Sequence, residues 1–159
     1  MAVLLDRRAS LSHPAGLSRP PGMQPLPTRL ALVLSALPNA AVGLWALLGP
    51  AGFYTDFPGL RTGWVAADGP FNEHLLRDFG GLNLALAITA IGALLMATPA
   101  AGRWAGAAIL AFNLPHALYH SLHLHAYPQL TDQVLIATTT WAAAALGLLA
   151  LLWPTRRTT

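Results

Sequence analysis

The stretch FGGLNLALAITAIGALLMAT (residues 79–98) contains no Asp, Glu, Lys or Arg and is predominantly apolar. A helix of about 20 such residues spans the roughly 30 Å hydrocarbon layer of a bilayer, whereas a buried helix of a soluble domain is usually shorter and polar on one side. Three further stretches without these charged residues, at 30–55, 104–131 and 133–155, each carry a similar segment. The sequence therefore predicts an all-α integral membrane protein, a four-helix up-down bundle.

The composition agrees with a membrane protein and argues against other classes. Hydrophobic residues make up 55% of the chain and charged residues 9%. The pI of about 10.2 arises from nine Arg, with no Lys, against six acidic residues, and no basic run exceeds two residues, so we expect no nucleic-acid partner. The chain has no cysteine, which excludes disulfides, thiolate metal ligands and thiol catalysis.

The expected organisation is one transmembrane domain between two tails. We predict spans at about 30–49, 79–98, 104–123 and 134–153 within a domain at 29–154, followed by a cytoplasmic C-terminal tail at 155–159. Residues 1–28 hold five prolines and show no apolar periodicity, so we predict a disordered cytoplasmic tail there, and Met23 is an alternative start. The lipid bilayer is the expected partner, and homo- or hetero-oligomers could form through the membrane helices.

The arginines predict the orientation. With both termini in the cytoplasm, seven of the nine Arg lie inside, and only Arg61 and Arg77 lie outside. This is the distribution that the positive-inside rule favours. We therefore expect a multi-pass protein of the cell membrane with both termini cytoplasmic. Trp45 and Tyr127 then fall near the outer interface, where aromatic rings are enriched.

The long outer connection, residues 50–71, contains five aromatic residues among Gly and Pro. Two interpretations stay open. The segment could fold onto the outer mouth of the bundle as a lid, or its rings could rest at the level of the lipid headgroups.

Polar residues cluster at the outer ends of two predicted spans. At about 100° per residue, His74 and Asp78 share a stripe with the small residues Gly81, Ala85, Thr89 and Gly92. Small residues at such spacing allow close packing of membrane helices, so we expect this stripe to face into the bundle. His116, His120 and His123 share one face of the next span. We predict that these five ionisable residues form one site, with Glu73, Asn83, Asn113 and Tyr119 around it.

Histidine and carboxylate together are typical ligands of transition metals. The leading hypothesis is a site for Zn, Fe or Cu, or for haem held by paired histidines. Two alternatives stay open: a structural polar network in a non-catalytic scaffold or partner-binding subunit, and a proton-relay or small-substrate site without metal. No catalytic residue is assigned, and whether the protein is an enzyme is left open.

Three segments carry a resemblance to known proteins: GFYTDFPG (52–59), GPFNEHLLRDFG (69–80) and PHALYHSLH (115–123). They resemble a group of uncharacterised small bacterial four-helix integral membrane proteins over roughly residues 30–153. The resemblance implies a four-span fold in the bacterial inner membrane and no particular activity. Size and span number also give a likeness to DoxX-like membrane proteins.

Overall fold

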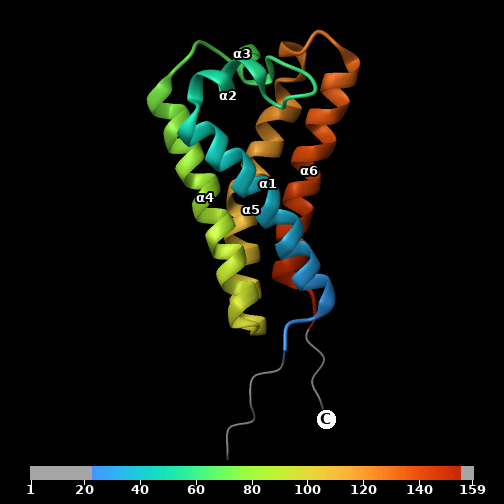
Figure 1. The fold of residues 1–159 in the computed structure, drawn as a ribbon. Helices are drawn as coiled ribbons and strands as arrows, with labels where there is room; N and C mark the ends of the chain where they lie inside the picture. The colour runs from blue at the N-terminus through green and yellow to red at the C-terminus, as the bar shows by residue number, and fades with distance from the viewer. Residues whose placement is uncertain (1–22, 155–159) are drawn as a thin grey trace, which may run out of the picture.

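The computed structural model describes residues 23–154, which form long helices joined by short connections. The long helices are α1 (Leu26–Leu48), α4 (Glu73–Met96), α5 (Pro99–Leu122) and α6 (Leu130–Leu152). The short ones are α2 (Pro50–Asp56), α3 (Trp64–Ala67) and the 3-10 turn η1 (Leu124–Ala126). Each long helix runs antiparallel to the next, as Figure 1 shows. We call the end that carries α2, α3 and η1 the loop end, and the opposite end the terminus end.

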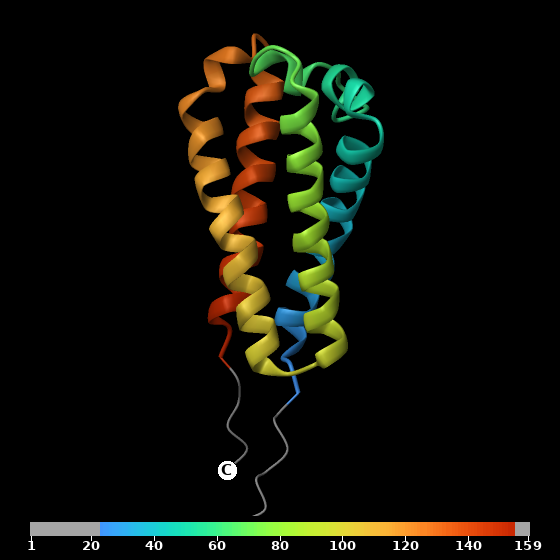
Figure 2. The same ribbon diagram turned by 90° about the vertical axis from the view of Figure 1, so that its left-hand side faces the viewer.

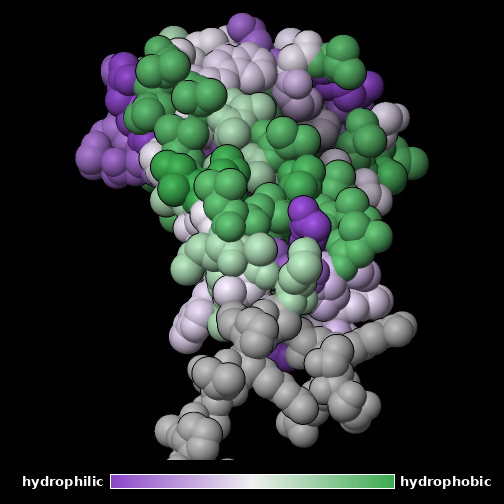
Figure 3. All heavy atoms as spheres, turned by 60° about the horizontal axis from the view of Figure 1, so that its bottom comes forward, coloured by the Kyte–Doolittle hydropathy of each residue, from purple (hydrophilic) through white to green (hydrophobic). Residues whose placement is uncertain are grey.

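Three of the four predicted spans, α1, α4 and α6, are long and apolar enough to cross a membrane. Only 28–33% of their most apolar 18-residue windows is buried, so most of this apolar surface faces outward. Figure 3 shows hydrophobic side chains covering much of one face. Helix α5 is equally long but less apolar, because it carries an arginine, an asparagine and two histidines. The described residues therefore form a helical structure in which three of the four long helices are candidates to span a membrane.

The first long helix begins slightly before the predicted boundary between tail and domain at residue 28. Helix α1 begins at Leu26, because Pro25 and Pro27 are compatible with a first helical turn, where no N–H is needed. Gln24 is also buried: its Nε2 donates to the carbonyl oxygens of Ala93 (2.8 Å) and Thr98 (2.9 Å) at the turn between α4 and α5. The rest of the predicted tail, residues 1–22, and the C-terminal tail at 155–159 lie outside the described residues.

Two glycine contacts organise the long helices into two closely packed pairs. In the α1–α4 pair, a Cβ added at Gly80 would lie 2.7 Å from the backbone nitrogen of Leu47 and 2.9 Å from the carbonyl oxygen of Gly43. In the α5–α6 pair, a Cβ at Gly106 would lie 2.5 Å from the backbone nitrogen of Leu151 and 2.8 Å from the carbonyl oxygen of Gly147. Backbones meet directly at both contacts, which only glycine permits.

The predicted packing stripe of α4 is therefore on the wrong face. Gly81, Ala85 and Thr89 are exposed, and nothing lies within 4 Å of a Cβ built at Gly81 or Gly92. The buried face instead runs through Leu76, Gly80, Asn83, Leu86, Ala87, Ala90 and Ala93. Two adjacent glycines, Gly80 and Gly81, left the choice of face open in the sequence, and the partner Gly43 on α1 decides it.

The aromatic connection folds onto the loop end, as the first of the two interpretations expected (Figure 1). We call α2, α3 and the residues between them the lid. Phe53 of the lid is 2% exposed, and its ring lies 5.8 Å from that of Trp45 on α1 and 5.9 Å from that of Phe79 on α4. Burial of aromatic rings between the lid and the α1–α4 pair stabilises this position. Tyr127, expected at the interface, is buried as well.

The glycine contact between α1 and α4 gives a stability prediction with an adjacent control. Gly80→Ala places a methyl group against the backbone of α1, so we expect a loss of about 1–3 kcal/mol in the free energy of unfolding. Gly81→Ala fills open space and replaces a poor helix former, so it should be neutral or stabilising. Thermal unfolding in detergent measures both variants. Equal stability of the two would contradict the contact.

Candidate functional site

A cavity of about 450 Å³ lies between the two helix pairs in the half of the domain nearer the loop end. The two pairs meet near the terminus end and diverge toward the lid, so that α6 is visible between α4 and α5 in Figure 2. The lid covers the open end. The cavity lining comes from all four long helices, the lid and the connections before α4 and α6: Pro38, Asn39, Val42, Phe53, Phe57, Trp64, Val65, Asp68, Leu75, Leu76, Phe79, Asn83, Phe112, Asn113, His116, Tyr119, His120, Tyr127, Ile136, Thr139, Thr140 and Ala143.

The half nearer the terminus end is closed by packing. Its buried core consists mainly of small residues from all four long helices: Ala31, Leu32, Ala36, Ala90, Ala93, Ala105, Ile109 and Ala150. Small side chains let membrane helices approach closely and fill the space between them. The cavity therefore ends at mid-height of the domain instead of continuing toward the terminus end.

The walls of the cavity are apolar and rich in aromatic rings. The ring of Phe112 stacks on that of His116 at 5.4 Å and lies 6.0 Å from that of Phe79 across the α4–α5 boundary. Phe57 of the lid packs against Trp64 at 6.2 Å. A concave, mainly apolar site with a small number of polar groups is the usual form of a small-molecule binding site.

Two of the predicted histidines enter this cavity side by side. The rings of His116 and His120, on successive turns of α5, meet edge to face with centroids 4.6 Å apart. The Tyr127 hydroxyl lies 3.5 Å from His120 Nδ1 and donates to the carbonyl oxygen of Trp64 at 3.4 Å. Burial, together with the negative charge of Asp68, raises the pKa of the Tyr127 hydroxyl, so this group remains a hydrogen-bond donor. Neutral imidazoles both donate and accept hydrogen bonds and can transfer protons.

The predicted placement of His74 and Asp78 is wrong. Their side chains are 88% and 65% exposed, and they form a pair with each other, at 3.3 Å, on the outer surface of α4. Both residues lie on the stripe of α4 that includes Gly81. This stripe was expected to pack against a neighbouring helix, but it faces outward. The prediction assumed that Gly81 packs against the neighbouring helix, whereas Gly80 does. One residue along a helix corresponds to a rotation of about 100°, so every residue of the predicted stripe points away from that helix.

The five predicted ligands therefore do not converge. His123 ends α5, its ring stacks on Tyr119 at 4.1 Å, and it does not line the cavity. Within residues 23–154, no group of three or more His, Cys, Asp or Glu residues is arranged to hold a metal ion. The geometry thus offers no support for the metal or haem hypothesis in its original form.

The four residues expected around the site divide in the same way. Asn83 and Asn113 are buried and line the cavity, and Tyr119 lies exposed at its edge. Glu73 lies outside the cavity and pairs with Arg77 at 2.8 Å, as the spacing of four residues predicts.

The sequence analysis missed other polar lining residues. Asn39, Thr139 and Thr140 line the cavity but were not among the predicted site residues. The threonine hydroxyls do bond to carbonyl oxygens of α6, yet both residues also line the cavity. Asn39, Asn83 and Asn113 stand out in the sequence as single amides in otherwise apolar helices, a signal that could have identified the cavity.

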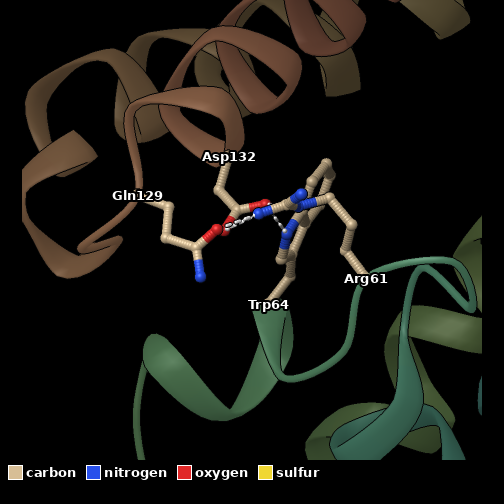
Figure 4. A network of polar contacts seen from close by, with 4 residues as sticks. All are labelled: Arg61, Trp64, Gln129 and Asp132. Atoms are coloured by element: carbon tan, nitrogen blue, oxygen red, sulfur yellow. Dashed lines mark hydrogen bonds and ion pairs between the residues drawn. The ribbon is translucent and has the colours of Figure 1, made fainter.

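A group of polar contacts fastens the lid to the beginning of α6 (Figure 4). Arg61 donates to both carboxylate oxygens of Asp132 and to the side-chain oxygen of Gln129. Trp64 Nε1 donates to the same carboxylate at 3.1 Å. The hydrogen bond to Asp132 raises the pKa of the Arg61 guanidinium, so the arginine stays charged. The lid thus spans both helix pairs: Phe53 packs on the first pair, and Arg61 and Trp64 bind the second.

This arrangement predicts that Asp132 controls access to the cavity. Because the protein has no cysteine, Val65→Cys introduces a single thiol on the lid where it lines the cavity. We expect Asp132→Ala to increase, several-fold, the rate at which a water-soluble maleimide labels this thiol. Asp78→Ala is the control, because Asp78 is a carboxylate at the loop end without contact to the lid. Equal rates in the two variants would mean that apolar packing alone holds the lid.

Comparisons with protein-family profiles, with curated proteins and with solved structures found no match to this chain. The resemblances noted from the sequence therefore add no activity, and the function has to be argued from the cavity.

Proposed function

We propose that this protein is a four-span membrane protein that binds a small, mainly apolar molecule in the cavity between its two helix pairs. The observation that carries the proposal is the cavity itself, about 450 Å³ with aromatic walls and a few buried polar groups. This volume lies within the range of small-molecule sites. An empty apolar space of this size costs stability unless a ligand fills it, because its lining lacks packing partners.

The chain path supports a membrane crossing by α5. Helices α4 and α6 both run from the loop end to the terminus end (Figure 1), so the chain must return between them. If α4 and α6 cross the bilayer, α5 crosses it too, in an up-down bundle. Its polar residues are then accommodated at the cavity: Asn113 and His120 are buried, and His116 is half-buried. Polar residues inside membrane domains usually face the interior in this way.

Exposed lining residues indicate how a ligand could enter. Leu75 of α4 and Tyr119 of α5 are exposed on one side of the cavity, and Pro38 of α1 and Thr139 of α6 on the other. Both sides lie where the two helix pairs diverge. We infer that an apolar molecule enters sideways from the lipid, because the lid covers the direct path from water.

The proposal includes an orientation with the terminus end in the cytoplasm. Arg29 and Arg103 lie at this end, and Arg156 and Arg157 follow α6 in the sequence. Asp56, Asp68, Asp78 and Asp132 lie at the loop end. This charge distribution favours a cytoplasmic terminus end.

Reporter fusions test this orientation. We expect reporters placed after residue 157 or in the turn between α4 and α5 to be cytoplasmic. A reporter inserted beside Leu60, which is fully exposed on the lid, should be external. An external C-terminus would contradict the proposed orientation, whatever the cavity binds.

Filling the cavity tests ligand binding. Ala143 lines the cavity and its neighbour Ala142 is exposed, so Ala143→Trp should fill the site while Ala142→Trp adds the same ring outside it. The probe is 2-methoxynaphthalene, an apolar bicyclic ether. Equilibrium dialysis with the protein in lipid nanodiscs measures its uptake, after subtraction of uptake by protein-free nanodiscs. We expect saturable binding by the wild type and Ala142→Trp, and none by Ala143→Trp.

Two results would contradict the proposal. If the wild type takes up no more probe than protein-free nanodiscs, the polar groups of the cavity form a structural network and a scaffold or partner-binding role is favoured. If Ala143→Trp and Ala142→Trp bind equally, the probe binds elsewhere on the protein.

A further inference from the structure

Each of the four long helices contributes one polar residue to the deep end of the cavity. Asn39 of α1 and Asn113 of α5 lie nine residues before the loop ends of their helices, and Asn83 of α4 and Thr140 of α6 lie ten residues after theirs. At 1.5 Å per residue all four are about 14 Å below the loop end, near mid-depth of a layer of roughly 30 Å. We call these four residues the polar ring.

The three amides of the polar ring have the same fixed orientation. Asn39, Asn83 and Asn113 donate from Nδ2 to the backbone carbonyl oxygen four residues earlier, at 2.8, 2.8 and 2.9 Å. A carbonyl oxygen can only accept, so the nitrogen of each amide must face it. The Oδ1 atom of each side chain is consequently turned away from its own helix.

These Oδ1 atoms lack partners. Within residues 23–154, the side-chain hydrogen bonds of the three asparagines are all made by Nδ2, and none reaches Oδ1. Asn83 and Asn113 are only 5% and 6% exposed, and both line the cavity. A hydrogen bond from a ligand to such an acceptor contributes about 1 kcal/mol net. The deep end of the cavity therefore presents unpaired Oδ1 acceptors from three helices, each beside the second, unbonded Nδ2 proton of the same amide.

We propose that the polar ring binds the hydrogen-bond donor group, a hydroxyl or N–H, of an otherwise apolar ligand. This inference rests on the proposed function and names the class of its ligand. The donor group reaches the Oδ1 atoms of Asn83 and Asn113, and the apolar body lies among the aromatic walls below the lid. The ligand is thus oriented with its polar group at mid-depth and its apolar part toward the loop end.

A metal cation fits the polar ring less well. The ring offers neutral oxygens and no carboxylate, and hard cations take six or more oxygen ligands, commonly including carboxylates. The adjacent lining residues Pro38, Phe112 and Ala143 are apolar, which raises the cost of burying a charge. A neutral donor group satisfies the amides without that cost.

The test compares 2-naphthol with its methyl ether 2-methoxynaphthalene, which has the same ring system and lacks the donor. Binding to the protein in lipid nanodiscs is measured by equilibrium dialysis, corrected for uptake by protein-free nanodiscs. We expect the wild type to prefer 2-naphthol by about fivefold, which corresponds to one net hydrogen bond. Asn83→Leu and Asn113→Leu should reduce the preference to nearly one while keeping affinity for the ether. Thr138→Val, at an exposed position of α6 outside the cavity, should keep it.

Each other outcome overturns the inference. If the wild type binds both probes equally well, the ligand does not need a hydrogen-bond donor, and the proposed function still stands. A preference that persists in both Leu variants would place the donor elsewhere, for instance at His116 or His120. Absence of binding by either probe would overturn the inference and the proposed function together. The comparison of the two probes in the wild type tests the inference even if a buried variant fails to fold.

Discussion

Direct backbone contact at two glycine pairs is the constraint on which the rest of this structure depends. Gly43 meets Gly80, and Gly106 meets Gly147, and at both contacts a single methyl group would collide with the opposite backbone. Hydrophobic burial gives little drive between helices in lipid, so packing at such contacts determines which helices pair. Between the two pairs, the close glycine contact that the structure shows within residues 23–154 lies at the terminus end, where a Cβ at Gly102 of α5 would lie 2.8 Å from Cγ2 of Thr28 on α1. The two pairs are therefore free to diverge toward the loop end, and this divergence creates the space that the lid covers.

The polar residues follow from this divergence. An amide or imidazole facing lipid is expensive, whereas the same group at an internal cavity can bond to its own helix, to a neighbour or to a ligand. Each of the three asparagines bonds one amide proton within its own helix and leaves its second amide proton and its Oδ1 atom available to another partner. His116 and His120 lie one and two turns nearer the loop end on α5. Polarity therefore rises inside the domain where the packing of small residues stops, and it remains low on the outer surface.

Length and hydropathy predicted the helical membrane class and the approximate positions of the long helices, because these depend on properties that a sequence carries locally. The helical face that packs depends on the partner, and here the prediction failed. The pair Gly80-Gly81 allows two faces 100° apart, and only Gly43 on another helix distinguishes them. For this reason the prediction placed His74 and Asp78 in the interior, although both lie on the surface. His116 and His120 do line the cavity, whereas His123, which the same periodicity put on their face, does not.

The lid shows why the loop end could be predicted only as alternatives. Its aromatic residues suit a headgroup interface as well as a packed cover. The choice depends on Asp132, which is 71 residues away from Arg61 in the sequence and accepts hydrogen bonds from both Arg61 and Trp64. Phe53 of the lid packs on the α1–α4 pair, and Asp132, which binds the lid, belongs to the α5–α6 pair. The lid therefore holds together the loop ends of the two pairs, which the glycine contacts leave free to separate. The same segment that closes the cavity to water thus also limits how far the cavity can widen toward the lipid.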